Sequence, residues 1–146
     1  GLGFHFDILG TDISARVVEH ARRGIYESEE VEGVPADLRA RYLMFSRKPN
    51  LGLVRVVPEL RERVRFRQLN LHDDNFALRE SFDVVFCRNA LMYFSATHRH
   101  EISRRICSYV RPDGFLFVGA SESLATAGLP LRFLGASTYQ RQGGRP

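Results

Sequence analysis

Apolar residues gather in short runs along the chain, and the spacing of these runs predicts strands at several places. Four runs are expected to form strands, at residues 6–11, 53–57, 82–87 and 115–118. The run at 6–11 is expected to form a short buried strand. The run at 82–87 is expected to be buried on both faces, as in a covered parallel sheet. Residues 131–134 and 137–141 flank a short turn around Gly135, which predicts an antiparallel hairpin.

Apolar and basic positions alternate between Arg63 and Gln68, which predicts a strand with two unlike faces. Val64 and Phe66 lie on one face, and a row of arginines lies on the other. Exposed charge of this kind suits an edge strand, where it opposes pairing with other chains. A basic strip that steers an acidic macromolecule is the alternative interpretation, and the edge strand is favoured.

Helical spacing of apolar residues predicts helices between the strands. The first begins at Asp12 or Ser14, either of which can act as the N-cap, and ends at Gly24. The second covers residues 36–45, and the third runs from the N-cap Ser95 to an Arg-Pro-Asp-Gly stop signal. Strands that alternate with helices indicate an α/β fold.

The stretch from Tyr26 to Arg61 interrupts this alternation. It contains an acidic loop, the helix expected at 36–45 and the short strand expected at 53–57. It is therefore interpreted as a small inserted β-subdomain, residues 27–61, on the edge of the main sheet. Such an insertion can bind a partner or can simply decorate the fold.

Composition indicates a single globular domain without membrane insertion. The 146 residues are 44% hydrophobic, and no apolar run reaches the roughly 18 residues of a membrane-spanning helix. The first residues lack the pattern of a signal peptide, so a cytoplasmic protein is expected. Cys87 and Cys107 are interpreted as reduced core residues and His98 and His100 as surface residues, so no metal site is expected.

The net charge of +4 conceals an unusual balance, because Lys48 is the only lysine among 21 basic residues. Arginine suits carboxylate or phosphate partners. The acidic residues are interspersed along the chain, however, and the aromatic residues do not interleave with arginines as they do in single-strand binders. Nucleic acid binding is therefore not expected.

The segment FDVVFCRNALMYF, residues 82–94, carries the most specific chemistry. An apolar strand runs directly into Arg88 and Asn89, and Tyr93 follows. In open α/β sheets ligands lie outside the carboxyl ends of the strands, so these side chains stand where a ligand would be recognised. The alternative is a plain strand-to-helix turn, in which Arg88 caps carbonyl groups and Tyr93 packs with its hydroxyl in water.

Asp12 and Asn70 end two other expected strands in the same way. A carboxylate at such a strand end can accept hydrogen bonds from ribose hydroxyls, whereas the alternative gives Asp12 only a capping role. Asn70 can equally make a simple turn. Spacing alone leaves these interpretations open.

Five motifs together resemble one family. In chain order they are ILGTDIS, LVRV, QLNL, FCRNALMYF and RPDGFLFVGASES. In this order they are similar to the CheR-type chemotaxis receptor methyltransferases, and the resemblance runs from about Asp7 to Tyr139. These bacterial enzymes transfer a methyl group from S-adenosylmethionine to glutamate side chains of chemoreceptors, and S-adenosylhomocysteine is the product.

The resemblance implies a Rossmann-like class I S-adenosylmethionine-dependent methyltransferase fold, whose mixed sheet has the strand order 3-2-1-4-5-7-6. Residues 1–146 would be a partial methyltransferase domain that starts at the family's second strand, with the small β-subdomain at 27–61 inserted in it. The family's N-terminal helical domain, first strand and cofactor-gripping loop have no counterpart in this sequence. The chain is therefore expected to have little activity by itself.

The resemblance also implies roles for single residues. Five of them would bind the cofactor, namely Asp12 at the ribose, Asn70 and Leu71 at the adenine, and Arg88 and Asn89 in the rest of the site. Tyr93 would be the catalytic residue beside the transferred methyl group, where its hydroxyl could orient the incoming carboxylate or the sulfonium. A glutamate is already ionised at neutral pH, so the reaction needs in-line placement but no general base and no metal.

The implied partners are the cytoplasmic helices of methyl-accepting chemotaxis receptors, with a receptor C-terminal tail docking on residues 27–61 in some members. Two other functions stay open. One is a non-catalytic receptor-binding or partner-binding module derived from the same fold. The other is a small-molecule methyltransferase, because a fold does not fix its substrate.

Overall fold

The computed structural model describes residues 5–48, 51–120, 122, 124 and 128–143. The chain divides into two compact units, residues 1–70 and residues 71–146. Within the described residues, no helix combines the length and the apolar character that crossing a membrane requires.

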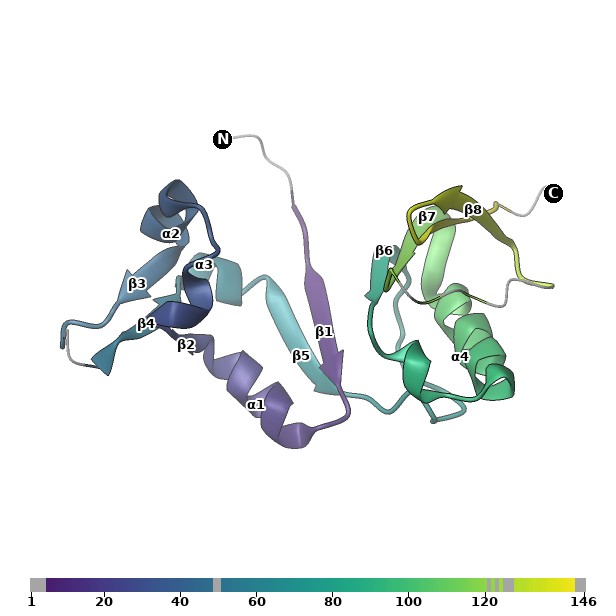
Figure 1. Ribbon diagram of the computed structural model, residues 1–146, viewed down its shortest axis with the longest axis horizontal. Helices are drawn as coiled ribbons and strands as arrows, with labels where there is room; N and C mark the ends of the chain where they lie inside the picture. The colour runs from purple at the N-terminus through teal and green to yellow at the C-terminus, as the bar shows by residue number, and fades with distance from the viewer. Residues whose placement is uncertain (1–4, 49–50, 121, 123, 125–127, 144–146) are drawn as a thin grey trace. The chain divides into compact units, whose positions relative to one another are not determined.

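The first unit is built on two parallel strands, β1 (Ile8–Asp12) and β5 (Val64–Gln68), which lie side by side in Figure 1. Helix α1 (Ala15–Arg23) packs against both strands. Gly10 lies opposite Phe66, and a Cβ at Gly10 would stand 2.7 Å from the Phe66 ring. A larger residue at this position would therefore have to displace the Phe66 ring.

Both expected ends of α1 are confirmed. Ser14 is the N-cap, and its hydroxyl accepts a hydrogen bond from the Val17 N–H. Gly24 ends the helix in the left-handed conformation, with φ of 59°, and its N–H donates to the Ala21 carbonyl. Glycine adopts this conformation without a steric penalty, which is why it marks the end of many helices.

A three-stranded antiparallel sheet follows α1, with the order β2-β4-β3. Its strands are β2 (Ile25–Glu27), β4 (Leu53–Val56) and β3 (Leu43–Phe45). The intervening and following helical segments are η1 (Ser28–Val31), α2 (Ala36–Tyr42) and α3 (Pro58–Arg61). Val54, in the central strand, is almost fully buried.

The helix expected at 36–45 is wrong over its last three residues. The helix ends at Tyr42, and Leu43–Phe45 form β3 instead. Pairing with β4 supplies these residues with sheet hydrogen bonds, which outweigh a helical pattern that is too short to be stable by itself.

The second unit holds a four-stranded sheet with the order β6-β7-β9-β8. The strands are β6 (Phe82–Cys87), β7 (Val110–Val118), β9 (Thr138–Arg141) and β8 (Leu131–Gly135). Strands β6 and β7 are parallel, and the other two pairings are antiparallel. The expected hairpin at β8 and β9 is confirmed.

Helix α4 (Ala96–Tyr109) begins after the N-cap Ser95, as expected, and packs on β7. The Arg-Pro-Asp-Gly segment ends the helix but is not a loop, because β7 starts at Val110. Its extra residues form an irregularity in the ladder, where Phe82 pairs with Val110 and Val84 already pairs with Phe115.

The strand orders of the two units match the order expected for the fold. In the series 3-2-1-4-5-7-6, β5 and β1 correspond to 3-2, and β6-β7-β9-β8 correspond to 4-5-7-6. The mixed pairing of the second unit also agrees, since β9 runs antiparallel to its neighbours β7 and β8, whereas β6 and β7 are parallel. The expected α/β class is confirmed.

The expected burial of β1, and of β6 on both of its faces, is wrong for the described residues. Ile8 is 49% exposed, Val84 is 46% exposed and Phe86 is 69% exposed. Each of the two strands has one strand partner within the described residues, so each ends its sheet. The core of the second unit instead surrounds β7 and α4, where Leu116 and Ile102 are nearly inaccessible.

Leu116 lies at the centre of this core, and its truncation should destabilise the second unit. We expect Leu116→Ala to lower the free energy of unfolding by about 2–5 kcal/mol, through lost burial and a residual cavity. Leu134→Ala is the matched control, because Leu134 is 46% exposed. Urea denaturation of both variants measures the difference, and equal losses would contradict this account of the core.

Candidate functional site

The loop that follows β6 is held by a single carboxylate. Glu122 accepts hydrogen bonds from the backbone N–H groups of Asn89 at 2.8 Å, Leu91 at 2.7 Å and Met92 at 3.2 Å. It also accepts one from the Gly119 N–H, at 2.7 Å, at the end of β7. One side chain therefore joins the carboxyl ends of two neighbouring strands.

Glu122 is only 7% exposed, yet its environment favours the ionised form. Burial by itself raises the pKa of a carboxyl group. The four N–H donors outweigh burial, and the pKa of Glu122 lies below its ordinary value. Nearby, burial and then the charge of Glu122 raise the pKa of the Cys87 thiol to about 11, so this thiol stays neutral.

The local sequence suits this arrangement. A Cβ at Gly119 would stand 2.5 Å from Glu122 Oε2 and 2.8 Å from Asn89 Oδ1, so only glycine fits there. Asn89 has a φ of 59°, a left-handed conformation that asparagine tolerates better than most residues. A single 3-10 turn, η3 (Leu91–Tyr93), then leads to α4.

The loop presents its predicted site residues to solvent. Leu91 is 1% exposed and anchors the turn in the core, whereas Tyr93 is 82% exposed. Arg88 and Asn89 are also exposed. The structure thus brings the three predicted residues of this loop together at the carboxyl end of β6, with their side chains accessible to a ligand.

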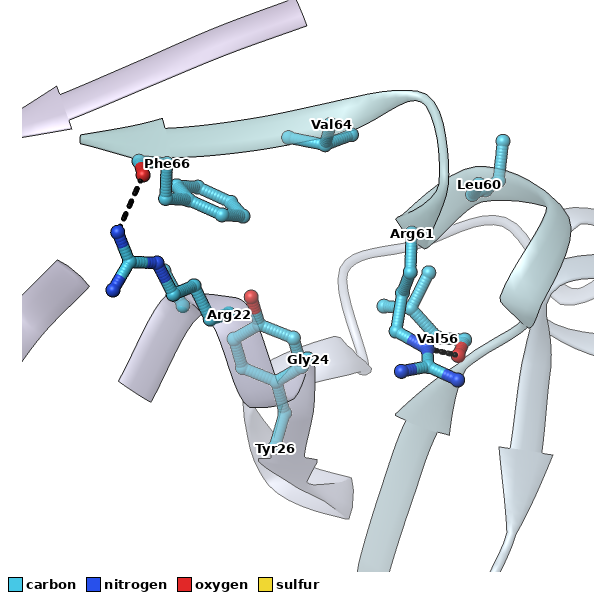
Figure 2. Close-up of a pocket in the computed structure, with 9 residues that line it drawn as sticks. Arg22, Gly24, Tyr26, Val56, Leu60, Arg61, Val64 and Phe66 are labelled. Atoms are coloured by element: carbon cyan, nitrogen blue, oxygen red, sulfur yellow. Dashed lines mark hydrogen bonds between the residues drawn. The ribbon is translucent and has the colours of Figure 1, made fainter. Parts of the chain in front are cut away.

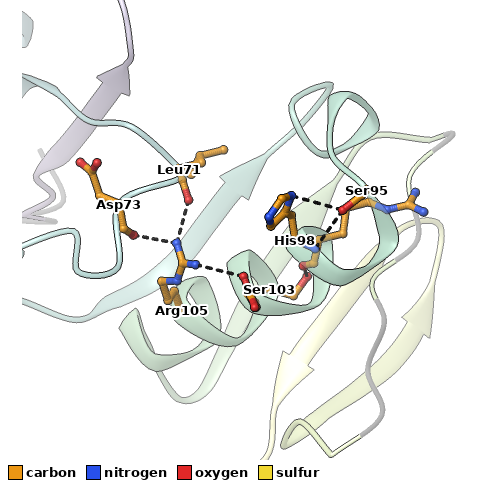
Figure 3. A network of polar contacts seen from close by, with 8 residues as sticks. Leu71, Asp73, Ser95, His98, Ser103 and Arg105 are labelled. Carbon is orange, nitrogen blue, oxygen red and sulfur yellow. Dashed lines mark hydrogen bonds and ion pairs between the residues drawn. The ribbon is translucent and has the colours of Figure 1, made fainter.

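A second loop, which follows residue 70, is held by an arginine from α4. Figure 3 shows Arg105 Nη1 donating to the carbonyl oxygens of Leu71, at 2.9 Å, and Asp73, at 2.6 Å. The Arg105 side chain is 14% exposed and also pairs with Glu101 at 3.7 Å. The predicted cofactor residue Leu71 is therefore fixed through its backbone.

The start of α4 lies near the same network. Ser95 Oγ accepts from the His98 N–H at 3.4 Å and lies 3.2 Å from His98 Nδ1, as Figure 3 shows. The His72 ring contacts the rings of Phe94 and His98. His98 is exposed, as expected, and the described residues contain no cluster of three or more metal-ligating side chains.

Asp12 stands at the carboxyl end of β1, beside the end of β5. Its carbonyl accepts from the Leu69 N–H at 2.9 Å, so the predicted residues Asp12 and Asn70 follow adjacent strand ends in the first unit. Asp12 Oδ1 also accepts from the Ser14 N–H at 2.8 Å. Asp12 is not the N-cap of α1, which is Ser14, and its bond to the Ser14 N–H engages one of its two carboxylate oxygens. Ribose binding stays a prediction.

A pocket of about 180 Å³ lies elsewhere in the first unit, among α1, β4, α3 and β5. Figure 2 shows that its two arginines are engaged with backbone carbonyls. Arg22 donates to Phe66 at 2.9 Å, and Arg61 donates to Val56 at 3.1 Å. Because the pocket holds none of the predicted site residues, we regard it as a packing junction.

The sequence interpretation missed both Glu122 and Arg105. Glu122 had a signal, because it is an acidic residue among small ones directly after a buried strand. Arg105 had a weaker one, since it immediately precedes Ile106, a buried position of α4. Neither signal identifies the backbone groups that these side chains bind.

Comparison with known proteins agrees with this architecture. Residues 1–139 match the family described as "CheR methyltransferase, SAM binding domain". The chain belongs to this family. The predicted family and the Rossmann-like class I fold are thereby confirmed, and S-adenosylmethionine (SAM) is the cofactor that this domain family binds.

Two relatives illustrate the match. The chain is 36% identical over 132 residues to chemotaxis protein methyltransferase 2 of Pseudomonas aeruginosa, covering 90% of the chain and 47% of the relative. It is 41% identical over 118 residues to the chemotaxis protein methyltransferase of Escherichia coli, covering 81% and 41%. The chain thus spans less than half the length of either curated relative.

Among solved structures, a glycopeptide N-methyltransferase, MtfA, in complex with S-adenosylhomocysteine is similar, with a TM-score of 0.48 and 15% identity. The likeness covers 94% of the chain and 45% of that protein. A likeness of this strength does not bear on the function of the CheR domain described here.

The ionised Glu122 should make the stability of the second unit depend on pH. Because folding lowers its pKa, its stabilisation is complete above the unfolded value of about 4.3 and is lost as the pH falls through the lower folded value. We expect the free energy of unfolding to fall less between about pH 6 and about pH 3.5 in Glu122→Gln than in the wild type.

Urea denaturation at both pH values measures this difference. Glu59→Gln is the control, because Glu59 is exposed in the first turn of α3 and should leave the pH dependence unchanged. Cys87 does not titrate in this range. The same pH dependence in Glu122→Gln and the wild type would show that folding does not lower the pKa of Glu122.

Proposed function

We propose that this chain is the cofactor-binding part of a cytoplasmic CheR methyltransferase that methylates glutamate side chains of chemotaxis receptors. The observation that carries the proposal is the family match over residues 1–139. The exposed side chains at the carboxyl end of β6 support it, because ligands of open α/β sheets bind at such ends.

The polar groups fit a ligand that contains adenosine. In the first unit, the Asp12 carboxylate can accept hydrogen bonds from ribose hydroxyls, and Asn70 can read a base through its amide. In the second unit, Leu71 has a fixed backbone, and Arg88 and Asn89 are exposed donors. We assign cofactor binding to these five residues on their position and chemistry.

The chemistry asks little of the protein beyond placement. S-adenosylmethionine supplies the methyl group, and the receptor glutamate is ionised at neutral pH. The protein must hold a carboxylate oxygen in line with the methyl group and exclude water, and such placement can contribute roughly 7–11 kcal/mol. We assign Tyr93 to this task, because its exposed hydroxyl can donate a hydrogen bond to the incoming carboxylate.

Methyl transfer by a protein extended upstream to the length of the curated relatives tests this function. We expect it to methylate receptor-containing membranes, and Tyr93→Phe to slow the transfer roughly 10- to 100-fold, the effect of losing a hydrogen bond to a charged group. Calorimetric titration with S-adenosylhomocysteine should give nearly the same Kd for the extended wild-type protein and for Tyr93→Phe. The reason is that Tyr93 is assigned to the carboxylate of the receptor glutamate and not to the cofactor.

Tyr42→Phe, in α2, is the matched control and should transfer methyl groups at the wild-type rate. Unchanged transfer by Tyr93→Phe would exclude a role for the hydroxyl. Methylation of free carboxylic acids but not receptors would favour the small-molecule methyltransferase. Receptor binding without S-adenosylhomocysteine binding would favour the non-catalytic module.

We further propose that a receptor C-terminal tail docks on the small sheet by extending it at β3. The Ser46 N–H donates to the Leu53 carbonyl, and the Val57 N–H donates to the Tyr42 carbonyl, which fixes the ladder of β3 with β4. Bonds in an antiparallel ladder alternate, so the backbone groups of Phe45 point away from β4. A strand edge of this kind can accept an extended peptide.

The opposite edge of the small sheet is less suitable. On β2, the outward N–H of Glu27 already donates to Glu30 Oε2 at 2.8 Å, within a capping box. Side chains at β3 also suit a peptide, because Met44 is 41% exposed and Phe45 is 57% exposed. We therefore assign the tail to β3.

Replacement of the Phe45 N–H tests this docking. We expect Phe45→Pro to weaken binding of a synthetic receptor C-terminal peptide about tenfold, because proline removes the donor. Phe45→Ala keeps the donor and should weaken binding less. Fluorescence anisotropy with a labelled peptide measures both, and equal affinities for Phe45→Pro and wild type would exclude the β3 edge.

A further inference from the structure

Glu122 has no part in the cofactor contacts or the chemistry described above, yet it is the most heavily bonded side chain of the candidate site. We propose that Glu122 is a positioning residue, whose carboxylate sets the backbone conformation of residues 88–93 and so presents Arg88, Asn89 and Tyr93 to the cofactor. The inference rests on the proposed function, because it specifies how the same site is assembled.

The geometry gives each carboxylate oxygen two donors. Oε1 accepts from the N–H groups of Leu91 and Met92, and Oε2 accepts from those of Asn89 and Gly119. An ionised carboxylate can accept about four hydrogen bonds, so this one is saturated. With its oxygens occupied and its side chain buried, Glu122 cannot act as a base or bind substrate, and its role is to place other groups.

The bonds hold the two least regular features of the loop. Oε2 binds the N–H of Asn89, which has a left-handed backbone, and Oε1 binds the first two residues of η3. Strand and helix ladders supply partners for backbone N–H groups, but a loop between them must find others. Without Glu122, these donors lose their acceptor, and the conformation that exposes Tyr93 loses its support.

Replacing Glu122 with glutamine separates the effect of its charge and its hydrogen-bond acceptors from the effect of its shape. Glu122→Gln fills the same volume, but its amide nitrogen can only donate and would face two N–H donors. Two of the four hydrogen bonds are therefore lost in either orientation of the amide. Gly119→Ala disturbs the same hydrogen bonds by steric contact and keeps the carboxylate, because its Cβ would stand 2.5 Å from Glu122 Oε2.

Two measurements on the variants test the proposal. The first is amide hydrogen exchange followed by NMR, where we expect exchange at Asn89, Leu91 and Met92 to become about tenfold faster or more in Glu122→Gln. The second is calorimetric titration of the extended protein with S-adenosylhomocysteine, where Kd should rise about tenfold or more. Gly119→Ala should change both in the same direction.

The controls separate local from global effects. Exchange in β1 and β5 should be unchanged in Glu122→Gln, and the exposed Glu59→Gln should resemble wild type in both measurements. Wild-type exchange at the loop amides in Glu122→Gln and Gly119→Ala would overturn the proposal. Faster loop exchange with an unchanged Kd would overturn the link to the cofactor.

The proposed function fails in a different way. If the extended wild-type protein does not bind S-adenosylhomocysteine, the cofactor site itself is wrong, and the link to the cofactor falls with it. The exchange measurement still decides whether Glu122 sets the loop. A general loss of folding is recognised by faster exchange throughout the second unit, including α4, and in that case Gly119→Ala decides.

Discussion

The candidate site depends on the buried carboxylate of Glu122, which accepts hydrogen bonds from backbone N–H groups that have no partner in a strand or helix. Where β6 ends, its N–H groups lose their sheet partners before α4 can supply new ones. Glu122 accepts three of these N–H groups and one from the end of β7. These bonds outweigh the cost of burying the charge and keep the pKa of Glu122 below its ordinary value. A left-handed asparagine and a one-turn helix can therefore persist between the two elements.

The loop after residue 70 is stabilised by the opposite charge. Arg105 of α4 donates to two carbonyl oxygens of that loop. Glu122, by contrast, accepts from N–H groups of the loop that follows β6. In both cases one charged side chain fixes the backbone of a loop. Because these bonds use backbone groups, the side chains of the loops stay available to bind a ligand while the loop backbones are held rigid at the strand ends. Arg88, Asn89 and Tyr93 can then be exposed without being disordered in their backbone.

The membership of the CheR family and the strand orders agree independently. The family match comes from residues 1–139, whereas the orders β5-β1 and β6-β7-β9-β8 come from hydrogen-bonded pairing. In chain order, the strands of the small sheet β2-β4-β3 lie between β1 and β5. The outward edge at β3 is where we propose that a peptide docks, and none of the residues assigned to the cofactor belongs to this strand.

The sequence by itself determined the strands other than β2 and β3, the caps of α1 and the residues at the strand ends, because these follow from local period, capping chemistry and motif order. Tertiary structure decided the rest. Leu43–Phe45 became a strand because β4 offers them hydrogen bonds, and β6 is less buried than its apolar run predicts because it ends its sheet. Glu122 could not be assigned from the sequence, since its role depends on the N–H groups of residues about thirty positions away, which only folding brings within hydrogen-bond distance.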